Sequence, residues 1–255
     1  MSNFLTRDPW ENLRRLTPAP IALGRAGAGL PTKDVLDFSL RHARAHDAVL
    51  AGLEVDAVDD TLRAQGFETV RVRSAAPDRG AYLRRPDLGR RLHPDDAALL
   101  KQRAGVADIA IIVADGLSSA AIHAHAAAFL HAAKPHLARN GFRVAPVAIA
   151  TQARVALGDE IGNLLRARLA IVLIGERPGL SSPDSLGVYL TYDPQIGRTD
   201  AERNCISNIR AAGLDYQTAA HRVFWLVEES LRLGKTGVAL KDMSDLTALG
   251  SSRFL

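Results

Sequence analysis

A glutamate and an arginine stand together where an apolar segment gives way to a loop rich in proline, glycine and serine. Residues 169–174 read LAIVLI, and Gly175, Glu176 and Arg177 follow. An apolar run of isoleucine, leucine and valine predicts a strand that is buried on both faces. Ligands of open α/β sheets bind beyond the carboxyl ends of the strands. Position alone therefore leaves two interpretations open: a ligand contact, or a solvated exit from the strand.

Two further predicted strands also end in loops. Residues 108–114 (DIAIIVA) are followed by a loop with Asp115 and Ser118, and residues 143–150 (RVAPVAIA) by a loop that ends at Val155. Loops that follow neighbouring strands of a parallel sheet lie at one edge of that sheet. We therefore treat all three loops as parts of one candidate site.

Helices separate these strands and determine the expected architecture. Apolar periodicity and end signals predict helices over 94–104, 119–139, 158–167 and 215–232. The alternation predicts an α/β fold with right-handed crossovers and a mostly parallel sheet flanked by helices on both faces. The three loops should then share one edge and seat a large or elongated ligand. Residues 186–192 can add an edge strand, and 200–210 is rich in groups that hydrogen-bond amides or hydroxyls.

A smaller, mainly helical region (1–94) is predicted to precede the α/β domain (95–255). It contains an arm, a helix over 32–50 with Thr32 as its N-cap, a second helix over 54–64 and a short strand around 69–73. Arginines are dense between residues 73 and 91, where prolines and glycines break any long helix, so we expect them on loops. They form either a solvated surface or an electropositive face for an acidic partner or phosphate. The tail after Gly234 is expected to be loosely docked.

The common catalytic and metal-binding patterns are missing. There is no GxSxG nucleophile elbow, no HExxH pair, no Walker motif and no DxHxxG pattern, and the glycines at 24, 27 and 29 follow the order GxxGxG, not GxGxxG. Cys205 is the only cysteine, which excludes a cysteine-based zinc site. The histidines near residues 119–139 do not form one helical stripe. These observations favour a cofactor-binding or accessory subunit over a self-sufficient enzyme.

Composition places the chain among ordinary globular proteins. It has 255 residues, 47% hydrophobic and 24% charged, with a net charge of +4 and a pI near 9.5. Only 5% of the residues are aromatic, which disfavours stacking on single-stranded nucleic acid. No apolar run reaches the ~20 residues of a membrane-spanning helix, and the N-terminus has no signal-peptide core. We expect a cytoplasmic protein that binds neither nucleic acid nor membrane.

Several colinear segments resemble the small (light) subunit of the adenosylcobalamin-dependent ethanolamine ammonia-lyases. They are LGRAGAGLPT (23–32), FSLRHARAHDAV (38–49), YLRRPDLGRRL (82–92), VADGLSS (113–119), IGERPGLSSPDSLGVYLTYDP (174–194) and AERNCISNI (201–209). The resemblance runs in order from about residue 8 to residue 233. Each segment alone is modest evidence, but their common order makes chance similarity an inadequate explanation.

The resemblance implies a partner and a cofactor. The partner is a large subunit whose barrel holds ethanolamine and the catalytic residues, so this chain would carry none. Adenosylcobalamin would lie at the junction of the two subunits, and several heterodimers would assemble. Radical chemistry that starts at the cofactor would convert ethanolamine to acetaldehyde and ammonia. Because DxHxxG is missing, the cofactor's own dimethylbenzimidazole is expected to keep the lower position on cobalt.

The resemblance also implies site residues. The cobalamin contacts of the family correspond here to Val155, Glu176 and Cys205. A second group of expected contacts is Asp115, Ser118, Arg177, Arg203 and Asn204. No metal ligand is expected in the chain, since Cys205 suits packing better than cobalt ligation.

Location and two alternative functions remain open from the sequence. Family members linked to ethanolamine-utilisation microcompartments usually carry an N-terminal extension, whereas the resemblance here begins at about residue 8. The free cytoplasm is therefore the first expected location and a microcompartment the second. The main alternative function is a stand-alone doubly wound domain that binds a nucleotide or phosphate ester. A basic nucleic-acid-binding module is a weaker alternative, and its affinity would fall steeply with salt.

Overall fold

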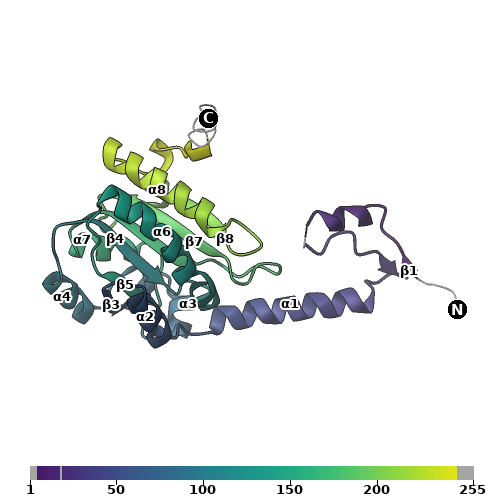
Figure 1. The fold of residues 1–255 in the computed structure, drawn as a ribbon. Coiled ribbons are helices and arrows are strands. Elements are labelled where there is room, and N and C mark those ends of the chain that lie inside the picture. The colour runs from purple at the N-terminus through teal and green to yellow at the C-terminus, as the bar shows by residue number, and fades with distance from the viewer. Residues whose placement is uncertain (1–4, 18, 246–255) are drawn as a thin grey trace, which may run out of the picture.

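The chain forms an α/β body from which a long N-terminal helix projects (Figure 1). A computed structural model describes residues 5–17 and 19–245. The elements, in chain order, are β1 (Leu5–Thr6), the short helix η1 (Glu11–Arg15), β2 (Arg25–Ala26), α1 (Thr32–Leu50), α2 (Val55–Ala64), β3 (Thr69–Arg73), α3 (Arg79–Arg84), η2 (Leu88–Arg90), α4 (Pro94–Gln102), β4 (Ala107–Ala114), α5 (Ser119–Ala121), the π-helical turn η3 (Ile122–Ala126), α6 (Ala127–Asn140), β5 (Val147–Thr151), α7 (Leu157–Leu164), β6 (Ala167–Gly175), β7 (Leu186–Tyr192), η4 (Asp200–Glu202), β8 (Asn204–Ile209), α8 (Tyr216–Leu233) and η5 (Gly237–Ala239).

The central sheet has six strands in the order β3-β5-β4-β6-β7-β8. Strands β3, β5, β4 and β6 run parallel to one another, whereas β7 pairs antiparallel with both β6 and β8. The predicted α/β class is confirmed, but the sheet is mixed because the parallel arrangement stops at β6. The connection from β6 to β7 contains no helix, and a parallel neighbour would need a crossover of roughly a dozen residues or more.

The two antiparallel strands differ from the expectation in their places. The segment 186–192 is a strand as predicted, but it lies inside the sheet between β6 and β8. The edge strand is β8, within a segment for which the sequence predicted only hydrogen-bonding side chains. Its residues read NCISNI, and only Ile206 and Ile209 are buried. Such a polar edge strand carries little of the apolar pattern from which strands are predicted.

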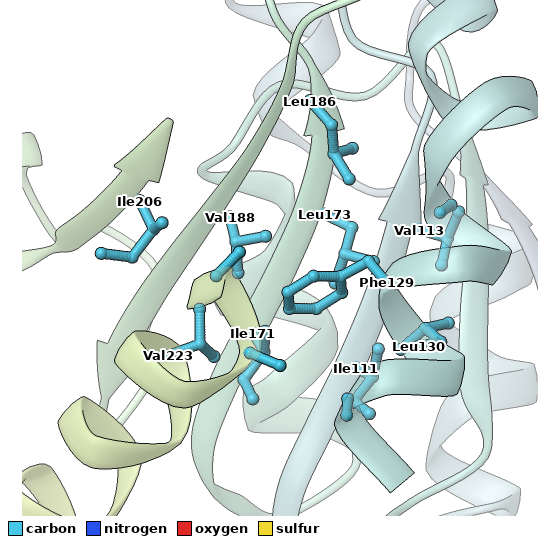
Figure 2. Close-up of a cluster of buried hydrophobic side chains, with 14 of the residues drawn as sticks. Ile111, Val113, Phe129, Leu130, Ile171, Leu173, Leu186, Val188, Ile206 and Val223 are labelled. Carbon is cyan, nitrogen blue, oxygen red and sulfur yellow. The ribbon is translucent and has the colours of Figure 1, made fainter. Parts of the chain in front are cut away.

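Helices cover the sheet on both faces, and each face has its own apolar core. Helices α2, α6 and α8 pack on one face, and α4 and α7 pack on the other. In β6, Ile171 and Leu173 join the first core while Val172 joins the second, as the two-residue period of a strand requires. Figure 2 shows Phe129 of α6 and Val223 of α8 against the first face. Burial on both sides explains the continuous apolar run in β6.

The second helical layer does not extend over the antiparallel strands. Among the described residues, the α4/α7 core has no fully buried member from β7 or β8, and Tyr189 borders it only partly. This face of β7 and β8 lies beside the carboxyl edge of β6, and it bears Cys205 opposite Tyr189. The sheet therefore leaves part of one face open near the predicted site.

The N-terminal arm, as described by residues 5–17 and 19–50, has almost no core of its own. Helix α1 contains no buried residue, and its exposed apolar side chains are Val35, Leu36, Phe38, Leu40 and Leu50. The predicted helix over 32–50 is confirmed, although Pro31 takes the N-cap position and Thr32 is the first helical residue. The arm is fastened to the body at its base, where Arg79 Nε donates to the Val49 carbonyl at 2.8 Å.

Residues 69–94 are part of the body. Strand β3 pairs with β5, so this segment contributes to the same sheet as residues beyond 94. The expectation that the arginines of 73–91 all lie on loops is wrong for Arg73, the last residue of β3, and for those in the short helices α3 and η2. Asp78 caps α3 by accepting the Ala81 amide N–H at 2.7 Å, and this six-residue helix fits between the flanking proline residues.

Candidate functional site

The loops that follow β4, β5 and β6 share one edge of the sheet, because these strands are parallel neighbours. Two glycines allow the β4 and β6 loops to touch. A side chain on Gly175 would collide with the Ser118 carbonyl, and one on Gly116 would collide with the Gly175 carbonyl. The Leu117 amide donates to the Gly175 carbonyl at 3.0 Å. Close backbone contact therefore joins two of the three predicted loops.

Asp115 belongs to the scaffold of this edge. It is 1% exposed, and its carboxylate accepts the amide N–H groups of Gln152 at 2.8 Å and Ala153 at 2.9 Å. The guanidinium of Arg79 lies 3.4 Å away. Burial raises the pKa of Asp115, and these hydrogen bonds and Arg79 oppose the rise. Asp115 thus holds the β5 loop, which continues to Val155, against the end of β4.

The loop between β6 and β7 is held near both ends. The Glu176 amide donates to the Ser185 carbonyl at 2.9 Å, and the buried Ser118 hydroxyl donates to the Pro183 carbonyl at 2.7 Å. Ser118 therefore also serves the scaffold. Arg177 is exposed and makes no hydrogen bond or ion pair within residues 5–17 and 19–245, so its guanidinium is available to a ligand or a partner.

The Glu176 carboxylate lies against β7, where a glycine makes room for it. A side chain on Gly187 would place its Cβ 2.8 Å from Glu176 Oε1. The Ser185 hydroxyl donates to this carboxylate, and the Asn208 amide approaches it at 3.4 Å. Glu176 is only half-buried, so it keeps acceptor capacity toward solvent. Strand β7 and its neighbour β8 thus orient the Glu176 carboxylate and leave some of its acceptor capacity free.

Cys205 and Tyr189 face each other across β8 and β7 and share a hydrogen bond. The surrounding protein atoms raise the pKa of the Cys205 thiol to about 11, with a smaller contribution from the Glu176 charge. Burial likewise raises the pKa of Tyr189, and Cys205 and Glu176 add to the rise. The cysteine is nevertheless exposed at the surface. The Cys205 thiol is therefore protonated at neutral pH, and the Glu176 carboxylate is close enough for its charge to influence the pKa of the thiol.

Val155 lies just before α7 and lines a cavity of about 510 Å³. It is partly buried and borders the α4/α7 core, as Tyr189 does. The cavity lining includes Val155 and Arg203 but neither Glu176 nor Cys205. The three first-choice residues therefore divide into a carboxylate–thiol cluster on β7 and β8, and an apolar contact at the start of α7.

Arg203 and Asn204 are structural to a large degree. Arg203 makes a bidentate pair with Asp159, at 2.6 and 2.7 Å, and both side chains are almost fully buried. The Asn204 side chain donates to the Leu240 carbonyl at 2.7 Å and accepts the Gly237 amide at 2.8 Å. Residues 237–240 are thus fastened to β8, and the expectation that the tail after Gly234 is loosely docked is wrong for them; residues 246–255 lie outside the described residues.

Several residues of this edge escape sequence reasoning. Tyr189, Ser185 and Arg79 are distant in sequence from the residues that they support, and only the strand pairing and loop contacts bring them together. His125 is buried between the Tyr216 hydroxyl at 2.9 Å and the Asp184 carboxylate at 3.3 Å. Within the described ranges, no group of histidine, cysteine and acidic side chains could hold a metal ion.

The fold and the site define a class: an α/β protein with a mixed sheet and a candidate ligand site where β6 meets the antiparallel strands. Comparison with known proteins then gives the family. The model of the ethanolamine ammonia-lyase light chain matches residues 7–241, and the chain belongs to this family. The sequence resemblance is confirmed.

Relatives from several bacteria support the assignment over nearly the whole chain. The chain is similar to an ethanolamine ammonia-lyase small subunit of Azotobacter vinelandii, with 52% identity over 96% of this chain and 92% of that one. A small subunit of Xanthomonas campestris pv. campestris is 53% identical over the same shares. One from Ralstonia nicotianae is 50% identical over 98% of this chain and 94% of that protein.

Proposed function

We propose that the chain binds adenosylcobalamin together with the large subunit of ethanolamine ammonia-lyase, for radical conversion of ethanolamine to acetaldehyde and ammonia. One observation carries the proposal beyond family membership. Val155, Glu176 and Cys205 all keep accessible surface, whereas Asp115 and Ser118 are buried and hydrogen-bonded to protein groups. The scaffold residues hold the loops, and the accessible ones face a ligand.

The accessible residues suit the chemistry of this cofactor. Val155 offers an apolar contact for a ring edge, and Glu176 offers acceptor oxygens for amide N–H groups or a ribose hydroxyl. Cys205 is exposed and small, and we propose it as a packing contact of the cofactor. When bound, the cofactor supplies a cobalt–carbon bond whose cleavage starts the radical chemistry, and this chain positions it.

The arm supports a role in docking the large subunit, which we assign to the predicted region 1–94. An isolated helix needs a packed apolar face for most of its stability, yet no residue of α1 is buried. Of the exposed large apolar residues in the described chain, most lie in the arm; examples are Trp10, Leu16 and Leu36. A concentration of exposed apolar side chains of this kind is typical of a protein interface. We further propose that the catalytic residues lie in the large subunit and that several heterodimers assemble.

Co-purification with the large subunit in added adenosylcobalamin tests the proposal. We expect a complex with corrinoid absorbance that forms acetaldehyde from ethanolamine. Glu176→Gln and Val155→Asp should weaken cofactor binding at least about tenfold, since each removes or buries a charge at the interface. Glu229→Gln is the matched control, because Glu229 pairs with Arg232 on α8 and should not affect binding. Unchanged cofactor affinity in both site variants would show that the assigned site is wrong.

Assays on the same purified proteins distinguish the alternative functions. A stand-alone nucleotide-binding domain would be stabilised by nucleotides without the large subunit, and a nucleic-acid-binding module would lose affinity steeply with salt. No helix in the described chain is long and apolar enough to cross a membrane. We propose the free cytoplasm as the location, with an ethanolamine-utilisation microcompartment as the alternative that fractionation would reveal.

A further inference from the structure

One buried histidine has no part in the site described above. Of the histidines at positions 123, 125, 131 and 136, only His125 is buried, with 5% of its surface exposed. It lies in η3, the π-helical turn that precedes α6 and packs against β6 and β7. Turns of this kind are rare and occur frequently at functional sites. Because a buried polar group costs free energy unless it is paired, the partners of this imidazole indicate its role.

The two ring nitrogens of His125 have partners in different elements. Nδ1 lies 2.9 Å from the hydroxyl of Tyr216, the first residue of α8. Nε2 lies 3.3 Å from Oδ2 of Asp184, in the loop between β6 and β7. An ionised carboxylate can only accept, so Nε2 donates to Asp184, and in the neutral ring Nδ1 accepts from the Tyr216 hydroxyl. His125 thus connects the loop to the helical layer.

This connection is rigid on the side of the histidine and accessible on the side of the loop. The His125 side chain is 6% exposed, whereas the Asp184 side chain is 41% exposed. The Tyr216 ring lies 6.0 Å from the imidazole, measured between centroids, and packs partly against the first core. Because interior side chains are closely packed, the imidazole cannot shift without disturbing its neighbours. The hydrogen bond therefore holds the loop in place against the body.

Asp184 lies beside the residue that supports Glu176. The Ser185 carbonyl accepts the Glu176 amide N–H at 2.9 Å, and the Ser185 hydroxyl donates to the Glu176 carboxylate. On the other side of Asp184, the Pro183 carbonyl accepts from the Ser118 hydroxyl at 2.7 Å. Residues 183–185 thus form a short support for Glu176, and the buried histidine holds the middle residue of this support.

We propose that His125 is a positioning residue: by holding Asp184 it fixes Ser185, and thereby the place of the Glu176 carboxylate. The inference deepens the proposed function and rests on it only for the role of Glu176 in cofactor binding. A histidine that merely completes the core would contribute to the stability of the whole body. A positioning histidine holds the loop in particular, so its loss should loosen the loop while the strands stay intact.

Amide hydrogen exchange of the full chain, followed by mass spectrometry, separates these two roles. Asp184→Ala removes the partner of the histidine at a partly exposed position, so the variant should fold. We expect the Glu176 amide, read in a peptide over residues 172–186, to exchange about tenfold faster, while peptides from β4 and β5 are unchanged. Unchanged exchange in the loop, or equal acceleration in the loop and the strands, would overturn the proposal.

Glu228→Ala is the matched control for the loss of an acidic side chain. The Glu228 side chain is also 41% exposed and accepts hydrogen bonds, from Arg139 and Asn140. These partners lie at the carboxyl end of α6, whereas His125 precedes its amino end. The control variant should therefore leave exchange in the peptide over residues 172–186 at the rate of the unmodified chain.

A second pair of variants tests the histidine itself. In His125→Gln the amide reaches about as far as Nε2, whereas in His125→Asn it reaches only about as far as Nδ1. Only the glutamine can therefore still donate to Asp184. We expect slow loop exchange in His125→Gln and faster loop exchange in His125→Asn. Equal loop exchange in the two variants would contradict the role assigned to Nε2.

The affinity of the complex with the large subunit for adenosylcobalamin tests the step from Asp184 to Glu176. Asp184→Ala should raise the dissociation constant about threefold, less than Glu176→Gln does, because the carboxylate is displaced and not removed. In the double variant Asp184→Ala should add nothing, since both changes act through one carboxylate. Losses that multiply in the double variant would overturn the proposal.

Failure of the proposed function would give a different result. If the unmodified complex does not bind adenosylcobalamin, or if Glu176→Gln leaves the affinity unchanged, the assigned cofactor contact is wrong. Hydrogen exchange in the loop still decides in that case whether His125 positions Glu176.

Discussion

Replacing Arg203 by methionine should lower the free energy of unfolding by about 3 to 5 kcal/mol, the typical loss when one partner of a buried ion pair is removed. The Arg203 and Asp159 side chains are 2% and 1% exposed. Two short bonds join them, and Arg203 also donates to the Thr191 hydroxyl at 2.9 Å and the Arg198 carbonyl at 2.8 Å. Arg203→Met would leave the Asp159 carboxylate buried at the start of α7 without its counter-charge.

The size of the effect can be checked in two ways. For a body of about 200 residues the unfolding entropy is ~0.4 kcal/mol per degree, so the melting temperature should fall by about 7 to 12 °C. Removing both charges in Arg203→Met/Asp159→Leu should restore much of the loss, since no charge is then left unpaired. The double-mutant cycle should therefore give a coupling of at least about 2 kcal/mol.

Urea and thermal unfolding followed by circular dichroism would measure these quantities. Arg232→Met is the control, because the Arg232–Glu229 pair on α8 is exposed and should contribute less than about 1 kcal/mol. A loss below about 1 kcal/mol for Arg203→Met, or a double variant as unstable as the sum of the singles, would refute the reasoning. Arg203 would then not be the structural connection between α7 and β8 that we describe.

Two further predictions concern titratable groups. Burial opposes ionisation of Asp59, but hydrogen bonds from Thr69, Arg63 and Arg71 outweigh it and lower the pKa from 3.8 to about 2. The resulting stabilisation, about 2 kcal/mol, should be complete above pH 4 and disappear as the pH falls through 2, and Asp59→Asn should flatten this part of the unfolding–pH curve. Cys205, with a thiol pKa near 11, should react with iodoacetamide at pH 8 roughly 100-fold more slowly than in the urea-unfolded chain; equal rates would contradict the raised thiol pKa.

The candidate site combines a rigid scaffold with a few accessible groups. Asp115 and Arg79 connect the β4 and β5 loops, and Arg79 also holds the base of the arm through the Val49 carbonyl. The segment that we assign to large-subunit docking is thus fastened to the same loops that carry Val155. Docking of the arm and the position of the ligand contacts therefore share one structural connection.

The sequence alone predicted most elements of the body, because they carry strong periodic patterns. The run in β6 is apolar throughout since helices cover both of its faces, and the strand β3 and the helix α1 were predicted at 69–73 and 32–50, the bounds they have. The colinear motifs identified the family correctly, and the match covers residues 7–241. These conclusions depend on local patterns and on order along the chain, both of which a sequence contains.

Only the tertiary structure decided which polar residues support the fold and which stay accessible. Ser118, Arg203 and Asn204 are polar residues in the expected segments, yet their partners lie 65, 44 and 36 positions away in the sequence. The antiparallel edge strand β8 has too few apolar residues to be recognised without its pairing to β7. Residues such as Glu176, Tyr189 and Cys205 gather because of strand register, and register is a property of the folded sheet that no single segment specifies.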